Sequence, residues 1–246
     1  MSTPTAPTYL LVHGAWHSGE SWQRVVPLLE SAGHRVLAPS LTGHGDKGRL
    51  LGPEVGLDTH IQDIVGLILE NDLTEVVLVG HSYAGLVVSG VADRVPDRIA
   101  QLVYLDAMVP ESGESALDVV PFTQALIDQA ATTDAPWRIP PLPELPAPFG
   151  LFGVSDPADL AWLRTLLSDE SLRCFQQPVR LDNPAARTIP RTHIHCVSDV
   201  PRIVTRRPVP ALQPNGSPAQ VWELPTGHDC MITMPAELTD LLLKLG

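Results

Sequence analysis

The fold of this chain is indicated by one stretch, Val76-Val77-Leu78-Val79-Gly80-His81-Ser82-Tyr83-Ala84-Gly85. Its first four residues are branched and apolar, which is typical of a short strand buried on both faces of a sheet. The residues after Ser82 begin a segment with helical character that runs to position 94. We therefore expect a strand that turns at Ser82 directly into a helix.

Small residues on either side of Ser82 indicate that this turn is sharp. Gly80 lies two residues before the serine and Ala84 two residues after it, and a strand-to-helix turn crowds both positions. The turn resembles the nucleophile elbow, G-x-S-x-G, which strains the serine backbone and exposes the hydroxyl above the sheet. Ala84 replaces the second glycine of that pattern and Gly85 follows it. We expect the elbow to tolerate the extra methyl group.

Strand-like and helix-like segments alternate around this turn. Apolar strand candidates occupy residues 9–12, 35–38, 76–79, 102–105, 194–197 and 221–224. Amphipathic helix candidates occupy 20–32, 58–70, 83–94 and 236–245, and Pro27 should kink the first of them. This alternation predicts an α/β fold with a doubly wound, mainly parallel sheet and helices on both faces.

The alternation stops between about residues 109 and 190, a proline-rich stretch that contains many aromatic residues. Two helices are plausible within it, near 121–131 and 157–167, and a structureless insertion of this length would be unusual. We interpret 109–190 as a helical cap, inserted before the strand expected to carry the catalytic acid. Residues 1–108 and 191–246 then form the core. Large side chains expected to line a pocket between cap and sheet are Trp16, Tyr83, Met108, Phe122, Phe149, Phe152 and Trp162.

A serine nucleophile needs a base and an orienting acid. The base candidate is His228, in a loop after the strand at 221–224, where sites of open α/β sheets form. The acid candidate is Asp199, just after the strand at 194–197, and Asp106, at the end of the strand at 102–105, is the alternative. Asp199 gives the chain order Ser, Asp, His that is typical of the elbow-containing hydrolases.

The oxyanion of a tetrahedral intermediate needs backbone amide donors. We expect one from Tyr83, at the start of the helix after the serine, and one from Ala15, in the loop His13-Gly14-Ala15-Trp16. His13 should brace that loop, and His44 should also be structural. His193 and His195 alternate along a strand, but no third ligand is near them in sequence, so no metal site is predicted.

Together, His13-Gly14-Ala15-Trp16, Gly80-His81-Ser82-Tyr83-Ala84-Gly85, Asp199 and Gly227-His228-Asp229 resemble the α/β-hydrolase superfamily. Within it, the spacing resembles the plant methylesterase and hydroxynitrile lyase group and its bacterial esterase relatives. The resemblance implies a triad of Ser82, Asp199 and His228 and oxyanion amides from Ala15 and Tyr83. Hydroxynitrile lyases carry a lysine after the catalytic histidine, where this chain has Asp229. The resemblance therefore favours ester hydrolysis over cyanohydrin cleavage.

The implied reaction is cleavage of a small apolar or aromatic carboxylic ester through an acyl-enzyme, without a cofactor. The alternatives are a lactonase, cyclase or acyltransferase that uses the same triad, and a receptor-like hydrolase with slow turnover. Lactones are therefore possible substrates as well as esters. Product analysis and turnover of generic esters would separate these readings.

Composition limits the partners. The 246 residues carry a formal net charge of −12 and no convincing basic cluster, which argues against nucleic-acid binding. The amino terminus lacks the features of a signal peptide, and no apolar run is long enough to span a membrane. Three widely separated cysteines do not suggest disulfides, so a cytoplasmic location is expected. The oligomeric state, monomer or homodimer, is left open.

Overall fold

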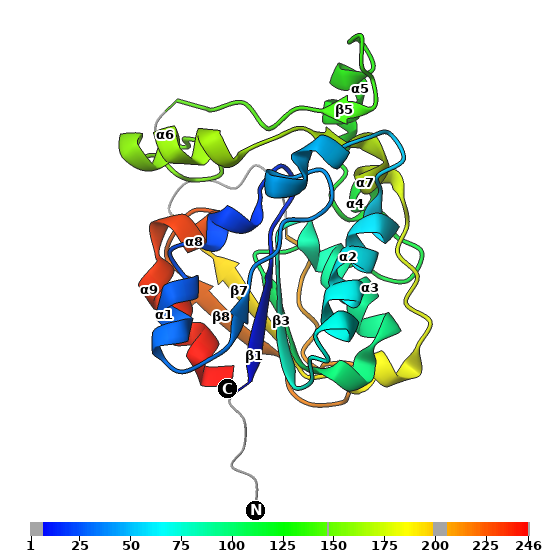
Figure 1. The fold of residues 1–246 in the computed structure, drawn as a ribbon, viewed down its shortest axis with the longest axis vertical. Coiled ribbons are helices and arrows are strands. Elements are labelled where there is room, and N and C mark those ends of the chain that lie inside the picture. The colour runs from blue at the N-terminus through cyan, green and yellow to red at the C-terminus, as the bar shows by residue number, and fades with distance from the viewer. Residues whose placement is uncertain (1–6, 147, 199–205, 246) are drawn as a thin grey trace, which may run out of the picture.

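The protein is built around a parallel six-stranded sheet (Figure 1). The computed structural model describes residues 7–146, 148–198 and 206–245. The strand order is β2-β1-β3-β4-β7-β8. The bounds are β1 Thr8–Val12, β2 Val36–Leu37, β3 Val76–His81, β4 Ile99–Leu105, β7 Arg191–Cys196 and β8 Gln220–Leu224. The predicted α/β fold with a doubly wound, mainly parallel sheet is confirmed.

Helices cover both faces of the sheet because successive strand residues point to opposite sides. Leu10 and Val12 of β1 belong to the apolar core beneath α2 (Leu57–Glu70) and α3 (Ala84–Arg94). Tyr9 and Leu11 belong to the opposite core, beneath α1 (Val26–Ser31) and α9 (Pro235–Leu242). Figure 1 shows the two layers on either side of the strands. The central strands β1, β3 and β4 are therefore largely buried, in agreement with their apolar sequences, whereas the edge strand β8 is partly exposed.

The first predicted helix, 20–32, is divided in the structure. A 3-10 turn, η1 (Gly19–Trp22), is followed by α1, which begins at Val26 and has Pro27 in its first turn. Proline is well suited to that position because its missing N–H has no intrahelical partner there. The expectation of a kinked continuous helix was wrong: Pro27 lies at a helix start.

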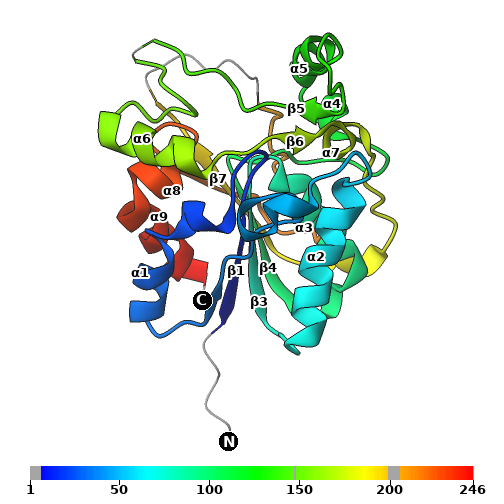
Figure 2. The ribbon, with the colours of Figure 1, turned by 45° about the horizontal axis from the view of Figure 1, so that its top comes forward.

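Residues 109–190, which we call the cap segment, separate β4 from β7. They contain α4 (Ala116–Val119), α5 (Thr123–Ala130), β5 (Arg138–Ile139), α6 (Pro157–Leu166), β6 (Glu170–Ser171), α7 (Leu172–Gln176) and η4 (Pro184–Thr188). β5 and β6 pair antiparallel in a small second sheet. Figure 2 shows much of this segment above one end of the central sheet. α5 and α6 lie within the two stretches in which the sequence predicted helices.

The remaining elements are short. They are η2 (Gly45–Leu50), η3 (Pro96–Arg98), α8 (Cys230–Thr233) and η5 (Leu243–Leu245). Across the described ranges, no helix combines the length and the apolar character needed to cross a membrane.

Candidate active site

Ser82 lies in the turn between β3 and α3 with a φ of 55°. This left-handed conformation is uncommon for a residue with a side chain and marks a strained position. Backbone hydrogen bonds hold it there: Ser82 N–H donates to Leu105 O at 3.2 Å, and Met108 N–H donates to Ser82 O at 2.9 Å. The end of β4 therefore fixes the turn.

Two glycines make room for this turn. A Cβ atom at Gly80 would lie 2.7 Å from Ala84 O, and one at Gly85 would lie 1.9 Å from Met108 O. The crowded position after the serine is therefore Gly85, where the helix start meets the backbone beyond β4. Ala84 is buried but is accommodated, which explains why this chain departs from the G-x-S-x-G pattern without losing the turn.

His228 is paired with a carboxylate from β4. Its Nδ1 lies 2.6 Å from Oδ2 of Asp106, whose side chain is only 1% exposed. Asp106 follows the last residue of β4 and has a φ of 43°. Because a carboxylate only accepts, Nδ1 of His228 carries the hydrogen, and Nε2 is the nitrogen that can accept a proton.

The other carboxylate oxygen of Asp106 is also occupied. Oδ1 accepts from the Cys196 amide at 3.3 Å and from Nη2 of Arg206, which also donates to Cys196 O at 3.2 Å. Asp106 N–H donates to Ile194 O at 2.7 Å. The carboxylate is thus held between the ends of β4 and β7.

Asp199, the acid that the sequence favoured, falls in 199–205, outside the described residues. The carboxylate that the structure places on His228 is the alternative, Asp106. Sequence reasoning could not separate them, because both follow a buried strand and both precede His228. The sequence does not show which strand end lies nearest the loop that contains His228.

The loop after β1 packs directly against the elbow. A Cβ atom at Gly14 would lie 2.9 Å from Ser82 Cβ, so only glycine allows this approach. Nε2 of the buried His13 accepts from Leu41 N–H at 3.0 Å, so Nδ1 carries the hydrogen and donates to Gly14 O at 2.9 Å. Because Gly14 C=O and Ala15 N–H belong to one peptide group, His13 fixes the direction of the Ala15 amide. The sequence predicted only that His13 braces this loop.

The amides of Ala15 and Tyr83 are both available. Within the ranges that the structure describes, neither N–H donates a hydrogen bond to another residue. Burial of an N–H donor without a hydrogen-bond partner is costly, so such donors often belong to a site that binds an acceptor. The sequence analysis expected the Tyr83 side chain to line the pocket, and this was wrong. The side chain is fully buried, and its hydroxyl contacts His60 Nδ1 at 3.1 Å.

Ser82, Asp106 and His228 line one cavity of about 770 Å³. Its walls include five of the large side chains that the sequence proposed, namely Trp16, Met108, Phe122, Phe149 and Phe152. The prediction that Trp162 lines the pocket was wrong, because it is not among the residues that line this cavity. Its ring lies 4.7 Å from the guanidinium carbon of Arg24, and it packs on the core beneath α1 and α9.

Backbone strain is concentrated at this cavity. Four non-glycine residues that line it have positive φ angles: Trp16 (68°), Ser82 (55°), Asp106 (43°) and Phe152 (52°). Strained conformations persist only where the surrounding structure imposes them, and they cluster at functional sites. The strain therefore supports the cavity as the functional site.

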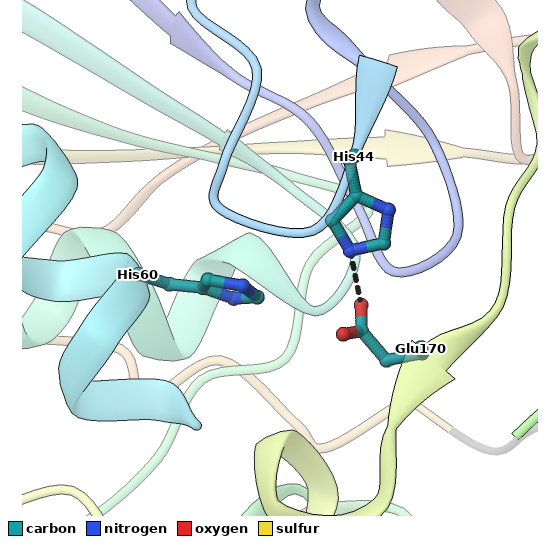
Figure 3. Close-up of side chains that lie close together, drawn as sticks. All are labelled: His44, His60 and Glu170. Atoms are coloured by element: carbon teal, nitrogen blue, oxygen red, sulfur yellow. Dashed lines mark ion pairs between the residues drawn. The ribbon is translucent and has the colours of Figure 1, made fainter. Parts of the chain in front are cut away.

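A second group of titratable residues, His44, His60 and Glu170, is buried between the core and the cap segment (Figure 3). His44 Nε2 lies 3.1 Å from Glu170 Oε2 and Nδ1 lies 2.9 Å from Ser168 Oγ. His60 contacts Tyr83 OH at 3.1 Å and Thr42 O at 3.0 Å. Each of the four ring nitrogens lies within 3.1 Å of a polar atom of a neighbouring residue, and the cluster joins β6 to the core.

Electrostatics agree with that role. Burial opposes ionisation of Glu170, but the neighbouring rings of His44 and His60 outweigh it and lower the pKa of Glu170 to about 2.

His193, on β7, is harder to protonate than an ordinary histidine: burial and nearby His195 and Arg191 lower its pKa to about 4. His193 and His195 do not join any group of three possible metal ligands among the described residues.

Comparisons with known proteins cover nearly the whole chain. A sequence profile described as "Alpha/beta hydrolase family" matches residues 9–241. The chain is 38% identical over 250 residues to a carbendazim-hydrolysing esterase of Nocardioides sp. (strain SG-4G), covering 97% of this chain and 99% of that protein. It is 38% identical over 110 residues to methylesterase 2 of Arabidopsis thaliana, covering 44% of this chain and 41% of that protein.

A solved structure shares the fold. An extracellular alpha/beta-hydrolase from a Paenibacillus species superposes with a TM-score of 0.74 at 23% identity, covering 98% of this chain and 99% of that one. At this identity the likeness concerns the fold alone. The resemblance that the sequence motifs suggested, to plant methylesterases and bacterial esterases, is confirmed by these matches.

Proposed function

The chain belongs to the alpha/beta hydrolase family, and on that premise we propose that it is a serine esterase whose triad is Ser82, His228 and Asp106. The observation that carries the proposal is the contact between His228 Nδ1 and the buried Asp106 carboxylate, in the cavity that Ser82 also lines. Ester hydrolysis is the activity named for a relative that matches 97% of this chain and 99% of its own length. It is preferred over lactonase, cyclase or acyl-transfer chemistry on the same triad.

The first half of the reaction forms an acyl-enzyme. Ser82 Oγ attacks the ester carbonyl carbon while His228 Nε2 takes the hydroxyl proton. The carbonyl π electrons move to oxygen, and Asp106 stabilises the imidazolium that forms. Collapse of the tetrahedral intermediate breaks the bond to the alkoxy oxygen, which leaves with the proton from His228.

The second half regenerates the enzyme. Water attacks the acyl carbon, His228 removes a proton from it, and Ser82 leaves as the protonated alcohol. In both halves the amides of Ala15 and Tyr83 hold the oxyanion. Their lack of partners among the described residues supports this role, because pre-oriented donors need no reorganisation as charge develops.

The cavity supports an apolar or aromatic substrate. In addition to Ser82, the cavity is lined by Trp16, Phe122, Leu126 and Phe152. Pockets with such walls bind apolar groups, while a few polar groups set the orientation of the ligand. Because the cap segment supplies three of these four side chains, we propose that residues 109–190 form the cap that selects the substrate over a core of 1–108 and 191–246. The three cysteines are buried and form no disulfide bond, which supports a cytoplasmic location.

The proposal is tested by comparing the chain with Ser82→Ala on p-nitrophenyl butyrate. We expect kcat to fall by roughly 10⁶-fold, since removal of a triad nucleophile has cost about that much elsewhere. Circular dichroism should show that the variant is folded. A folded Ser82→Ala protein that kept its esterase activity would remove Ser82 from the mechanism. Product analysis with an added alcohol separates hydrolysis from acyl transfer.

A further inference from the structure

The residue after the base, Asp229, is completely buried and is not part of the triad. Its Oδ2 accepts from His17 Nε2 at 3.0 Å, and the side chains are 0% and 2% exposed. Its Oδ1 lies 3.8 Å from His81 Nε2. A buried carboxylate must be paired to remain charged, so His17 is the group on which Asp229 depends.

The contacts of His17 define its protonation state. Nε2 faces the Asp229 carboxylate, and Nδ1 lies 2.8 Å from Ala15 O. Both are acceptors, so both ring nitrogens must carry hydrogen, and His17 is an imidazolium. Burial opposes this charge, but Asp229 outweighs burial and raises the pKa of His17, while His17 lowers the pKa of Asp229. The two form a buried ion pair.

This ion pair connects the two loops that carry the catalytic groups. His17 holds the carbonyl of Ala15, which lies one peptide group after the Ala15 N–H that the proposed mechanism assigns to the oxyanion, and Asp229 directly follows the proposed base His228. The Asp229 amide also donates to Phe152 O of the cap segment at 3.0 Å. Nearby, His81 Nε2 donates to His228 O at 3.1 Å. Four segments therefore meet at Asp229: the loop after β1 that contains Ala15 and His17 (the oxyanion loop), the elbow, the loop after β8 that contains His228 (the base loop), and the cap segment.

We infer that the His17–Asp229 ion pair positions the Ala15 amide relative to His228 and is required for acyl transfer, although neither side chain touches the substrate. This inference rests on the proposed function. Without the pair, the carbonyl of Ala15 loses its donor, and the oxyanion loop is no longer tied to the base loop. Because an oxyanion donor acts only when correctly aimed, the loss should appear in transition-state stabilisation and not in substrate binding.

The experiment compares His17→Gln and Asp229→Asn with the unmodified chain on p-nitrophenyl butyrate. We expect kcat to fall by about 10–100-fold, since misplacing a catalytic group by about 1 Å can cost that much, with KM changed less than about threefold. The inhibition constant of an aryl trifluoromethyl ketone, which forms an oxyanion on the serine, should rise by a similar factor.

Glu170→Gln is the matched control. It removes the charge from another buried histidine–carboxylate pair, His44–Glu170, that does not line the cavity. We expect a lower melting temperature but kcat and the ketone inhibition constant within about twofold of the unmodified chain. If Glu170→Gln lowered kcat as much as Asp229→Asn, or if the folded His17 and Asp229 variants kept kcat within threefold, the inference would be overturned.

A measurement on the unmodified chain covers the case in which both variants fail to fold. The ¹⁵N spectrum of the histidine rings at neutral pH should show the ring assigned to His17 doubly protonated, with slowly exchanging hydrogens at both nitrogens. Absence of double protonation at His17 contradicts the inference. Failure of the proposed function is distinguishable, because Ser82→Ala would then retain activity whatever the His17 and Asp229 variants do.

Discussion

At the residue scale, the site depends on which carboxylate faces His228. Asp106 follows β4, the strand that pairs with β3, and Ser82 follows β3. The Oδ2 atom of Asp106 lies 2.6 Å from Nδ1 of His228. The sequence offers one candidate each for the nucleophile, the base and the oxyanion amides because each lies in a short, chemically distinctive motif. It offers two candidates for the acid, since one aspartate after a strand looks like another in sequence and only sheet order brings one of them to the histidine.

Exchange of this carboxylate for an amide tests the assignment. In Asp106→Asn, the side chain no longer carries the charge that stabilises the imidazolium, and the wrong tautomer of His228 is favoured. We expect kcat for p-nitrophenyl butyrate to fall by about 10⁴-fold. Asp199→Asn is the control and should retain kcat within about threefold. If Asp199→Asn lost activity and Asp106→Asn kept it, Asp199 would be the acid of the triad.

At the element scale, the fold could be predicted to within a few residues because buried parallel strands are short apolar runs. β3 was expected over 76–79 and spans Val76–His81, and β8 was expected over 221–224 and spans Gln220–Leu224. The first helix was less predictable: Pro27 is compatible with either a kink or a helix start, and tertiary packing of α1 decides between them. The strained turns at Ser82 and Asp106 also depend on contacts distant in sequence.

The close approach of α3 to the end of β4 gives a prediction on stability. A methyl group at Gly85 would lie 1.9 Å from Met108 O, a backbone atom that cannot move without disturbing the elbow. We expect Gly85→Ala to lower the free energy of unfolding by about 3 kcal/mol, at the upper end for overpacking. The matched change Ala84→Gly should cost no more than about 1 kcal/mol. Urea denaturation measures both, and equal costs would contradict the assignment of Gly85 as the crowded position.

At the scale of the whole molecule, buried histidine–carboxylate pairs join segments far apart in the chain. Glu170 of the cap segment meets His44 of the core, and Asp229 of the base loop meets His17 of the oxyanion loop. Sequence reasoning anticipated that His44 is structural but could not find its partner, which lies more than a hundred positions away. The Trp162 assignment failed for a similar reason, because a tryptophan in a helix can face either the cavity or the core.

The Glu170–His44 pair predicts how stability depends on pH. The pKa of Glu170 is lowered to about 2 in the folded protein, from an ordinary value of 4.5. Its ionised form therefore stabilises the fold above about pH 4.5, and this contribution is lost as the pH falls toward 2. Each pKa unit corresponds to about 1.4 kcal/mol.

Glu170→Gln should accordingly be less stable than the unmodified chain at pH 6, and the difference should shrink by pH 3. Urea denaturation at the two pH values measures it. A stability difference that stayed constant between pH 6 and pH 3 would show that the carboxylate is not held ionised in the folded state.

The central claim is that Ser82 is the nucleophile, and the most direct measurement is peptide mapping after reaction with a fluorophosphonate. The account predicts one adduct per chain, on Ser82, formed by the unmodified protein and lost in Ser82→Ala. It also predicts much slower labelling of Asp106→Asn, because the activating base is impaired. Adduct formation on another residue, or no reaction with a folded unmodified chain, would contradict the account.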